Sequence, residues 1–104
     1  MFNLRKNYGE VTIQKESLEE ILENATIKLQ YYQTRDRNSK KNEKQYGVGI
    51  IKTQVGTNEL NEEKQEFNNI FEQKSEANDL LKILLENKVT PIDLKYVLED
   101  MAIQ

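Results

Sequence analysis

The sequence contains no cysteine, no histidine and no tryptophan, and it has a single proline. Without cysteine the chain forms no disulfide, offers no thiol nucleophile and builds no cysteine-based zinc or iron–sulfur site. Without histidine it lacks the commonest general base and the commonest transition-metal ligand. These absences disfavour catalytic triads, zinc hydrolases and haem proteins. We therefore expect a protein that is not an enzyme, with no catalytic residues, no metal and no cofactor.

Long hydrophobic runs are also missing. No stretch approaches the roughly 18 apolar residues of a membrane span, and the basic start at Arg5 and Lys6 is not followed by the apolar segment of a signal peptide. We expect a cytoplasmic protein without membrane contact. The dominance of Lys, Asn, Ile, Glu and Gln is typical of an AT-rich genome, which indicates a low-GC bacterium or one of its phages or mobile elements. A phage-encoded protein would act in the host cytoplasm.

The chain is 104 residues long, with 37% hydrophobic and 32% charged residues. This length predicts a single small domain, 1–104, with a modest core. The lean apolar content favours a homodimer that completes its core by self-association.

Two segments have the pattern of short strands. In 8–14, Val11 and Ile13 alternate with polar residues, which predicts a half-buried strand. In 46–55, Val48 and its apolar neighbours lie among glycines, which predicts a second strand. The two strands could pair antiparallel as a β-ribbon, which needs a helix or another strand for stability.

Three segments have the pattern of helices. The first, 17–33, begins with a capping box at Ser17 and Glu20 and continues with apolar residues at spacings of three and four. The second, 58–87, is a long helix with a polar first half and a strongly apolar second half. The third, 91–102, starts at Pro91, where the missing N–H costs nothing.

The pattern therefore predicts a mainly α fold with a minor α+β character: a small helical domain with a long helix, a C-terminal helical hairpin and the short ribbon. The predicted core consists of Val11, Ile13, Leu18, Ile21, Leu22, Leu29, Ile50, Phe67, Ile70, Leu81, Leu84, Val97 and Leu98.

The stretch "NKVTPIDLKYVLEDM", 87–101, resembles the first two helices of helix-turn-helix and winged-helix domains. That resemblance implies a DNA-reading helix. The outward positions of 91–102 include Asp93, Glu99 and Asp100, however, and three acids would face the phosphates. The stretch is better interpreted as an architectural hairpin.

A basic segment lies in the middle of the chain. Residues 31–56 carry six basic and two acidic side chains, whereas 57–104 carry five and eleven. The predicted loop 33–45 has no apolar residue, and Tyr31, Tyr32 and Tyr46 flank it as aromatic groups that could stack on bases. This segment is a solvated loop, a surface for an acidic protein, or a track for a phosphate backbone. Its candidate binding residues are Arg35, Arg37, Lys40, Lys41, Lys44 and Tyr46.

An acidic surface is expected at the start of the long helix, where the candidate residues are Glu59, Glu62, Glu63 and Glu66. Such a surface is either a solvated helix face or a mimic of nucleic-acid phosphates that occupies the basic groove of a target.

These observations predict a non-catalytic protein-interaction module, encoded by a phage or mobile element, that binds a host protein as a regulator or inhibitor. The partner is an unidentified protein. The alternative is a nucleic-acid-binding accessory protein that uses the basic segment 35–44. A minor alternative is the acidic nucleic-acid mimic.

Overall fold

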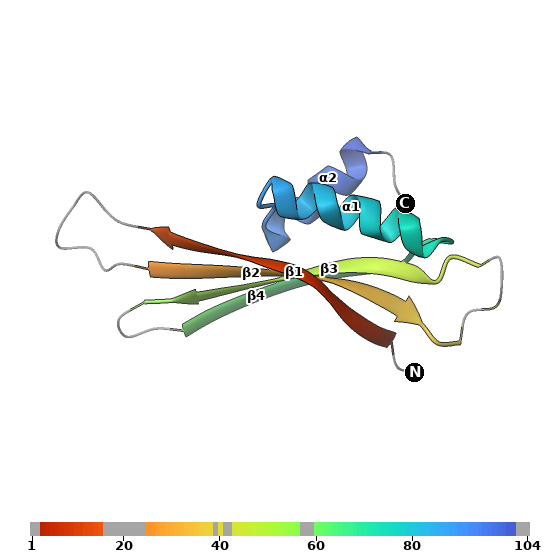
Figure 1. Cartoon of the computed structure of the whole chain (residues 1–104), viewed down its shortest axis with the longest axis horizontal. Coiled ribbons are helices and arrows are strands. Elements are labelled where there is room, and N and C mark those ends of the chain that lie inside the picture. The colour runs from red at the N-terminus through yellow and green to blue at the C-terminus, as the bar shows by residue number, and fades with distance from the viewer. Residues whose placement is uncertain (1–2, 16–24, 39, 41–42, 57–59, 102–104) are drawn as a thin grey trace.

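Four antiparallel strands and two helices make up the protein in the computed structural model, which describes residues 3–15, 25–38, 40, 43–56 and 60–101 (Figure 1). The strands are β1 (Asn3–Lys15), β2 (Ala25–Asp36), β3 (Tyr46–Val55) and β4 (Leu60–Phe71), and the helices are α1 (Lys74–Glu86) and α2 (Pro91–Asp100). The strands lie side by side in chain order as a meander. Within the described ranges, neither helix has the length and apolar character needed to cross a membrane.

The prediction of a mainly helical fold is wrong, because strands outweigh helices and the protein is an α+β protein with a large sheet. Of the predicted helix 17–33, the part from residue 25 onward belongs to β2, and its capping box at Ser17 and Glu20 lies outside the described residues. The predicted helix 58–87 combines β4 with α1, and only its second half is helical.

Other elements occur where the sequence indicates them. The predicted strand 8–14 lies within β1, and the predicted strand 46–55 has the bounds of β3. The direct pairing of these two strands is wrong, since β2 lies between them. Part of the predicted loop 33–45 also belongs to β2, so the connection to β3 starts only after Asp36. Helix α2 covers 91–100 of the predicted helix 91–102.

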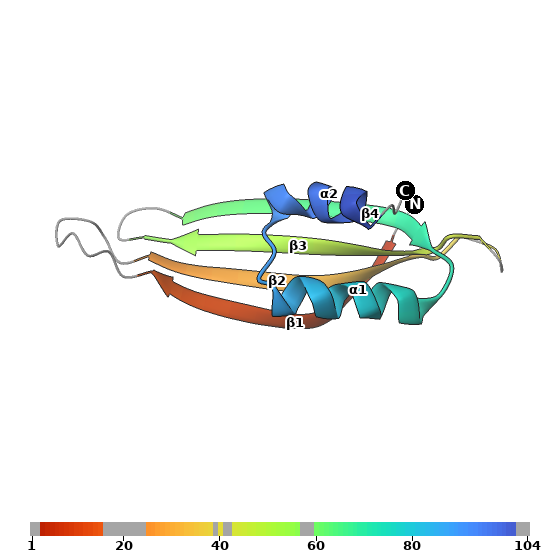
Figure 2. The same cartoon turned by 90° about the horizontal axis from the view of Figure 1, so that it is seen from above.

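The core lies between the sheet and the two helices. Figure 2 shows α1 above β1 and β2, and α2 above β3 and β4. Strand alternation directs Leu29 and Tyr31 of β2 to this side, together with Val48 and Ile50 of β3. The helices contribute the buried residues Ala77, Leu80, Leu81, Leu84, Leu94 and Leu98. Burial of these apolar side chains is the main favourable term for folding.

A β-bulge between Asn7 and Gly9 shifts the alternation of β1. Residues that pair across an antiparallel ladder share a face. Because Lys6 pairs with Gln33 and Gly9 pairs with Tyr31, both Lys6 and Gly9 lie on the helix side. A Cβ atom at Gly9 would lie 2.7 Å from Leu85 Cδ1, so α1 approaches β1 closely at this glycine.

Neither α1 nor α2 covers the opposite face of the sheet, yet Tyr32 is only 4% exposed there. Its ring lies across Gly49, where a Cβ atom would overlap the ring. The Tyr32 hydroxyl donates to Glu66 Oε1 at 2.7 Å. The Arg5 guanidinium carbon is 5.1 Å from the ring centroid, and Arg5 Nη2 lies 3.3 Å from Glu66 Oε1. One residue from each strand thus contributes to this cluster, the Tyr32 clasp (Arg5, Tyr32, Gly49 and Glu66).

The contact between Tyr32 and Gly49 predicts a specific instability. Gly49→Ala should lower the free energy of unfolding by about 1–3 kcal/mol, because the added methyl displaces the ring. In a Tyr32→Ala background the same substitution should cost much less, and the two changes should couple by about 1 kcal/mol or more. Urea denaturation of the four proteins measures this cycle. Additive effects would show that the ring does not lie on Gly49.

Candidate functional site

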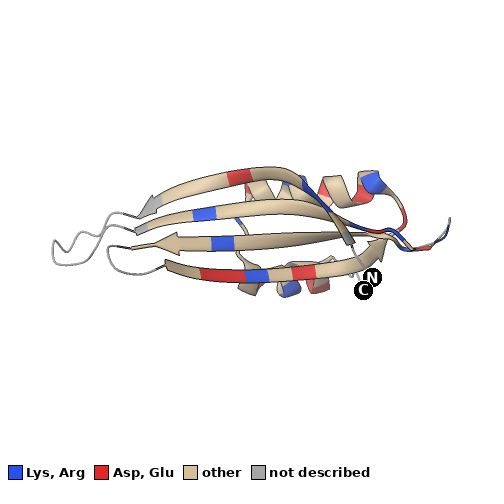
Figure 3. Ribbon diagram, turned by 90° about the horizontal axis from the view of Figure 1, so that it is seen from below, with Lys and Arg blue, Asp and Glu red and all other residues tan. Residues whose placement is uncertain are grey.

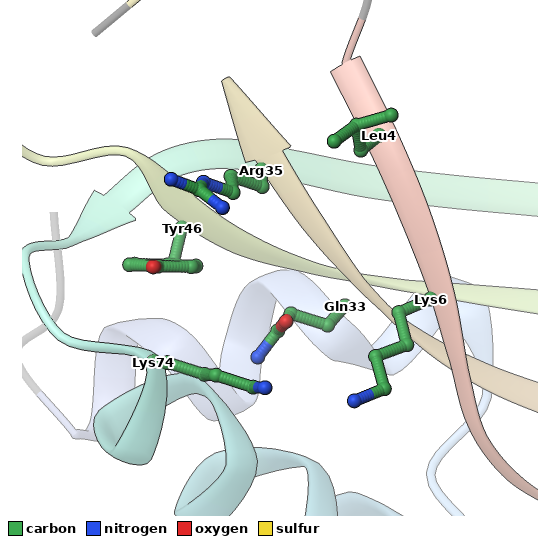
Figure 4. A pocket seen from close by; sticks show the side chains of 6 residues that line it. All are labelled: Leu4, Lys6, Gln33, Arg35, Tyr46 and Lys74. Carbon is green, nitrogen blue, oxygen red and sulfur yellow. The ribbon is translucent and has the colours of Figure 1, made fainter. Parts of the chain in front are cut away.

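A small pocket opens on the helix side of the sheet, beside the first turn of α1 (Figure 4). Its volume is about 170 Å³. Leu4 and Lys6 come from β1, Gln33 and Arg35 from β2, Tyr46 from β3 and Lys74 from α1. Three of the six lining residues are cations and none is acidic. The pocket is therefore a candidate site for an anion.

The sheet register brings these residues together. Leu4 pairs with Arg35 and Lys6 pairs with Gln33, so β1 and β2 present two adjacent rungs on the same face. Arg35 also pairs with Tyr46 of β3, and its guanidinium carbon is 5.8 Å from the Tyr46 ring centroid.

Helix α1 borders the pocket. Gln33 is 6% exposed, and its Nε2 donates to Asn78 Oδ1 at 3.0 Å. This bond joins β2 to α1 one turn after Lys74. Figure 4 shows the Lys74 and Lys6 side chains reaching into the same space.

The cations of the pocket differ from the other strand cations. Lys28 pairs with Glu10 and Lys52 with Glu63, and both Arg5 and Lys64 pair with Glu66. Across the described residues, no ion pair is formed by Lys6, Arg35 or Lys74. Their charges are available to a ligand.

The connection between β2 and β3 adds further cations at the same end of the sheet. Arg37, Lys40 and Lys44 are exposed. Two acids at this end of the sheet accept backbone hydrogen bonds from the connection. Asp36 Oδ1, at the end of β2, accepts from the Asn38 amide at 2.9 Å, and Glu43 Oε1 accepts from the Lys40 amide at 2.6 Å. We call the surface formed by these cations and those of the pocket the basic end; its described residues are Lys6, Arg35, Arg37, Lys40, Lys44 and Lys74.

The structure changes the set of residues indicated by the sequence. Arg35 and Tyr46 lie in the pocket, and Lys41 lies outside the described residues. The interpretation of Tyr31 and Tyr32 as base-stacking groups is wrong, since Tyr31 is buried under the helices and Tyr32 is buried in the clasp. The sequence interpretation missed Lys6, Gln33 and Lys74. Period-two alternation through 27–35 was the signal for Gln33, whereas nothing local indicates Lys6 or Lys74.

The acidic surface is not a helix face. Glu62 and Glu66 lie on the open face of β4, whereas Glu63 pairs with Lys52 on the helix side. Glu59 lies outside the described residues. Figure 3 shows acidic and basic bands alternating along β4. The predicted acidic residues of β4 therefore lie on two faces of the sheet, and lysines pair with some of them. No continuous acidic surface covers the described part of β4.

Glu66 has a specific structural role. Its burial alone would raise its pKa, but hydrogen bonds from Tyr32 and Asn68 and the charges of Arg5 and Lys64 outweigh burial and hold its pKa below the ordinary 4.5. Burial, followed by the bond to Glu66 and its charge, raises the pKa of Tyr32, and burial raises the pKa of Tyr31 to about 12. Both tyrosines are neutral at physiological pH, and Glu66 is ionised.

Metal-ligating side chains do not gather in the part of the chain that the structure describes, where no group of three Asp or Glu residues could hold an ion.

The fold and pocket together define a small α+β protein in which two helices cover one face of a four-stranded meander. The chain belongs to a family whose model is described as "Family of unknown function (DUF6514)" and matches residues 9–104. Searches of the curated proteins and of the solved structures found no match.

The depressed pKa of Glu66 predicts an acid-sensitive stability. Its contribution is complete above about pH 4.5, the ordinary pKa of the unfolded carboxyl, and is lost as pH falls through the lower folded pKa. Glu66→Gln should cost about 1–2 kcal/mol at neutral pH, since it removes the charged acceptor of Tyr32. This difference should shrink below pH 4.5. Urea denaturation across pH measures it, with Glu62→Gln as the control. A constant difference between wild type and Glu66→Gln would contradict the assignment.

Proposed function

We propose that this protein is a non-catalytic interaction module that binds an acidic segment of a partner protein at its basic end, and so regulates or inhibits that partner. The observation that carries this proposal is the convergence of Lys6, Arg35 and Lys74 on one pocket without a compensating acid. Opposite charges across an interface steer the encounter and select the partner. The adjoining cations Arg37 and Lys40 extend the surface along a bound segment.

The same cations would attract nucleic acid, but the aromatic groups favour a protein. Binding to single strands relies on aromatic faces on which bases stack. Tyr31 is fully buried and Tyr32 is 4% exposed. The guanidinium of Arg35 lies over the ring of Tyr46. Nucleic acid is therefore the second candidate, supported by charge and by one partly buried ring at the basic end, Tyr46.

The same proposal includes the absence of catalytic activity and a location in the cytoplasm. The chain has no histidine or cysteine to serve as base or nucleophile. Glu66, the described carboxylate with a shifted pKa, is shifted toward the ionised form, whereas a general acid needs the opposite shift. We place the activity in the cytoplasm. The amino-acid composition indicates a low-GC bacterium or one of its mobile elements as the source.

Binding to a dye-labelled oligo-glutamate peptide, followed by fluorescence anisotropy, tests the proposal. We expect binding that weakens with salt, and Arg37→Gln, Lys40→Gln and Lys44→Gln together should weaken it about tenfold, equivalent to about 1.4 kcal/mol. The matched control removes three charges elsewhere, with Lys64→Gln, Lys82→Gln and Lys95→Gln.

Two results would contradict the proposal. Equal losses in the basic-end variant and in the control variant would show that net charge alone attracts the peptide. A single-stranded oligonucleotide of equal charge that binds far more tightly than the peptide would favour the nucleic-acid function.

A further inference from the structure

We propose that the pocket lined by Lys6, Arg35 and Lys74 binds the dianionic phosphoryl group of a phosphomonoester. This inference rests on the proposed function and names the chemical group that its site recognises. Two sources carry such a group: a phosphorylated side chain within the acidic segment of the partner, and a free small phosphomonoester.

The charge of the pocket suits a dianion. Lys6 lines it from β1, Arg35 from β2 and Lys74 from α1, so three cationic residues border one small volume, with the Arg35 guanidinium over the Tyr46 ring. Like charges that converge repel one another, and an anion between them relieves the repulsion. A phosphomonoester carries a charge of about −1.5 to −2 at neutral pH, whereas a glutamate carries one negative charge. The phosphoryl group therefore gains more from the same three cations.

The difference between paired and unpaired strand cations supports a binding role for the pocket. Among strand cations with described side chains, Arg5, Lys28, Lys52 and Lys64 form ion pairs with glutamates, and Arg5 and Lys64 share Glu66. Lys6 and Arg35, both in the pocket, are the two strand cations in these described ranges that form no ion pair. The other strand cations whose side chains are described are paired, so these two are left for an external anion.

The pocket is also partly organised before a ligand arrives. Asn78 holds the amide of Gln33 at the floor, and Tyr46 supports the guanidinium of Arg35. Along β2 the helix side changes from apolar Leu29 and Tyr31 to polar Gln33 as it enters the pocket. The bond from Asn78 offsets the free-energy cost of burying the Gln33 amide, so this side of the pocket is polar without an unpaired group among its described residues.

The donor types fit the oxygens of a phosphoryl group. Arginine presents a planar fork that binds two phosphate oxygens at once, and each lysine supplies a compact charge with three donors. A tetrahedral group with three terminal oxygens can use donors from three directions, whereas a carboxylate offers two oxygens in one plane. The chemistry of these donors thus favours a phosphoryl group over the carboxylates that surround it in an acidic segment.

Three glutamate-rich peptides that differ at one position provide the test: one has phosphoserine there, one glutamate and one serine. Affinities for the full chain are measured by fluorescence anisotropy. We expect the phosphoserine peptide to bind at least about tenfold more tightly than the glutamate peptide. Lys6→Gln with Lys74→Gln should remove this preference, and the glutamate peptide should still bind, though more weakly, because Arg35, Arg37, Lys40 and Lys44 remain. Arg35→Lys should reduce the preference, since lysine cannot form the two-oxygen contact.

The control variant, Lys82→Gln with Lys95→Gln, removes two charges from the helices at positions that do not line the pocket. Circular dichroism checks that each variant is folded. Competition by free O-phosphoserine tests whether a small phosphomonoester is the ligand. Competition at concentrations similar to the phosphopeptide would support a free phosphomonoester as the source, and weak competition would support a phosphorylated protein.

The outcomes separate this inference from the proposed function. If phosphoserine and glutamate peptides bind equally, and the variant with Arg37→Gln, Lys40→Gln and Lys44→Gln binds both more weakly, the proposed function stands and the phosphoryl site is overturned. If neither peptide binds, both are overturned. If the preference for phosphoserine survives Lys6→Gln with Lys74→Gln, the phosphoryl group binds outside this pocket and the inference is overturned.

Discussion

When helices cover only one face of a sheet, that face buries apolar side chains. The uncovered face then needs another source of stability. Leu29 and Tyr31 face the helices, while their neighbour Tyr32 faces away, so β2 supplies both layers. The helix side is a conventional apolar core. The open side depends instead on one aromatic ring laid across a glycine and bonded to a glutamate on the far strand. Both layers require the same register of β2 against β3.

That register also creates the pocket. The rungs that place Leu29 and Tyr31 under the helices continue, two and four residues later, to Gln33 and Arg35 at the end of the core. There the apolar side chains of β2 are followed by the polar Gln33 and the cationic Arg35. The bulge in β1 brings Lys6 to the same side, and α1 begins close enough to add Lys74. The pocket is thus the end of the core, where the sheet and helix no longer exclude water.

The errors in the sequence interpretation have physical causes. Leu22, Ala25, Leu29 and Tyr32 are spaced like a helical stripe, but Ile27, Leu29 and Tyr31 also alternate like a strand, and the β-branched and aromatic residues there favour the strand. β4 is rich in Glu, Lys and Gln, which favour helices in isolation. As an edge strand it uses these charges to prevent pairing with other sheets. The second half of that predicted helix contains a dense apolar stripe, and it is the helical α1.

The sequence by itself determined the strand at 46–55, the helix after Pro91, the second half of the long helix and the basic character of the β2–β3 connection. These features are local, because each depends on the alternation, spacing or charge of neighbouring residues. Only the tertiary structure decided that 25–36 takes a central position in the sheet, that Tyr32 is buried and that Lys6, Arg35 and Lys74 line one pocket. These features depend on strand register and on the packing of α1, which bring together residues from opposite parts of the chain. No local pattern encodes that convergence.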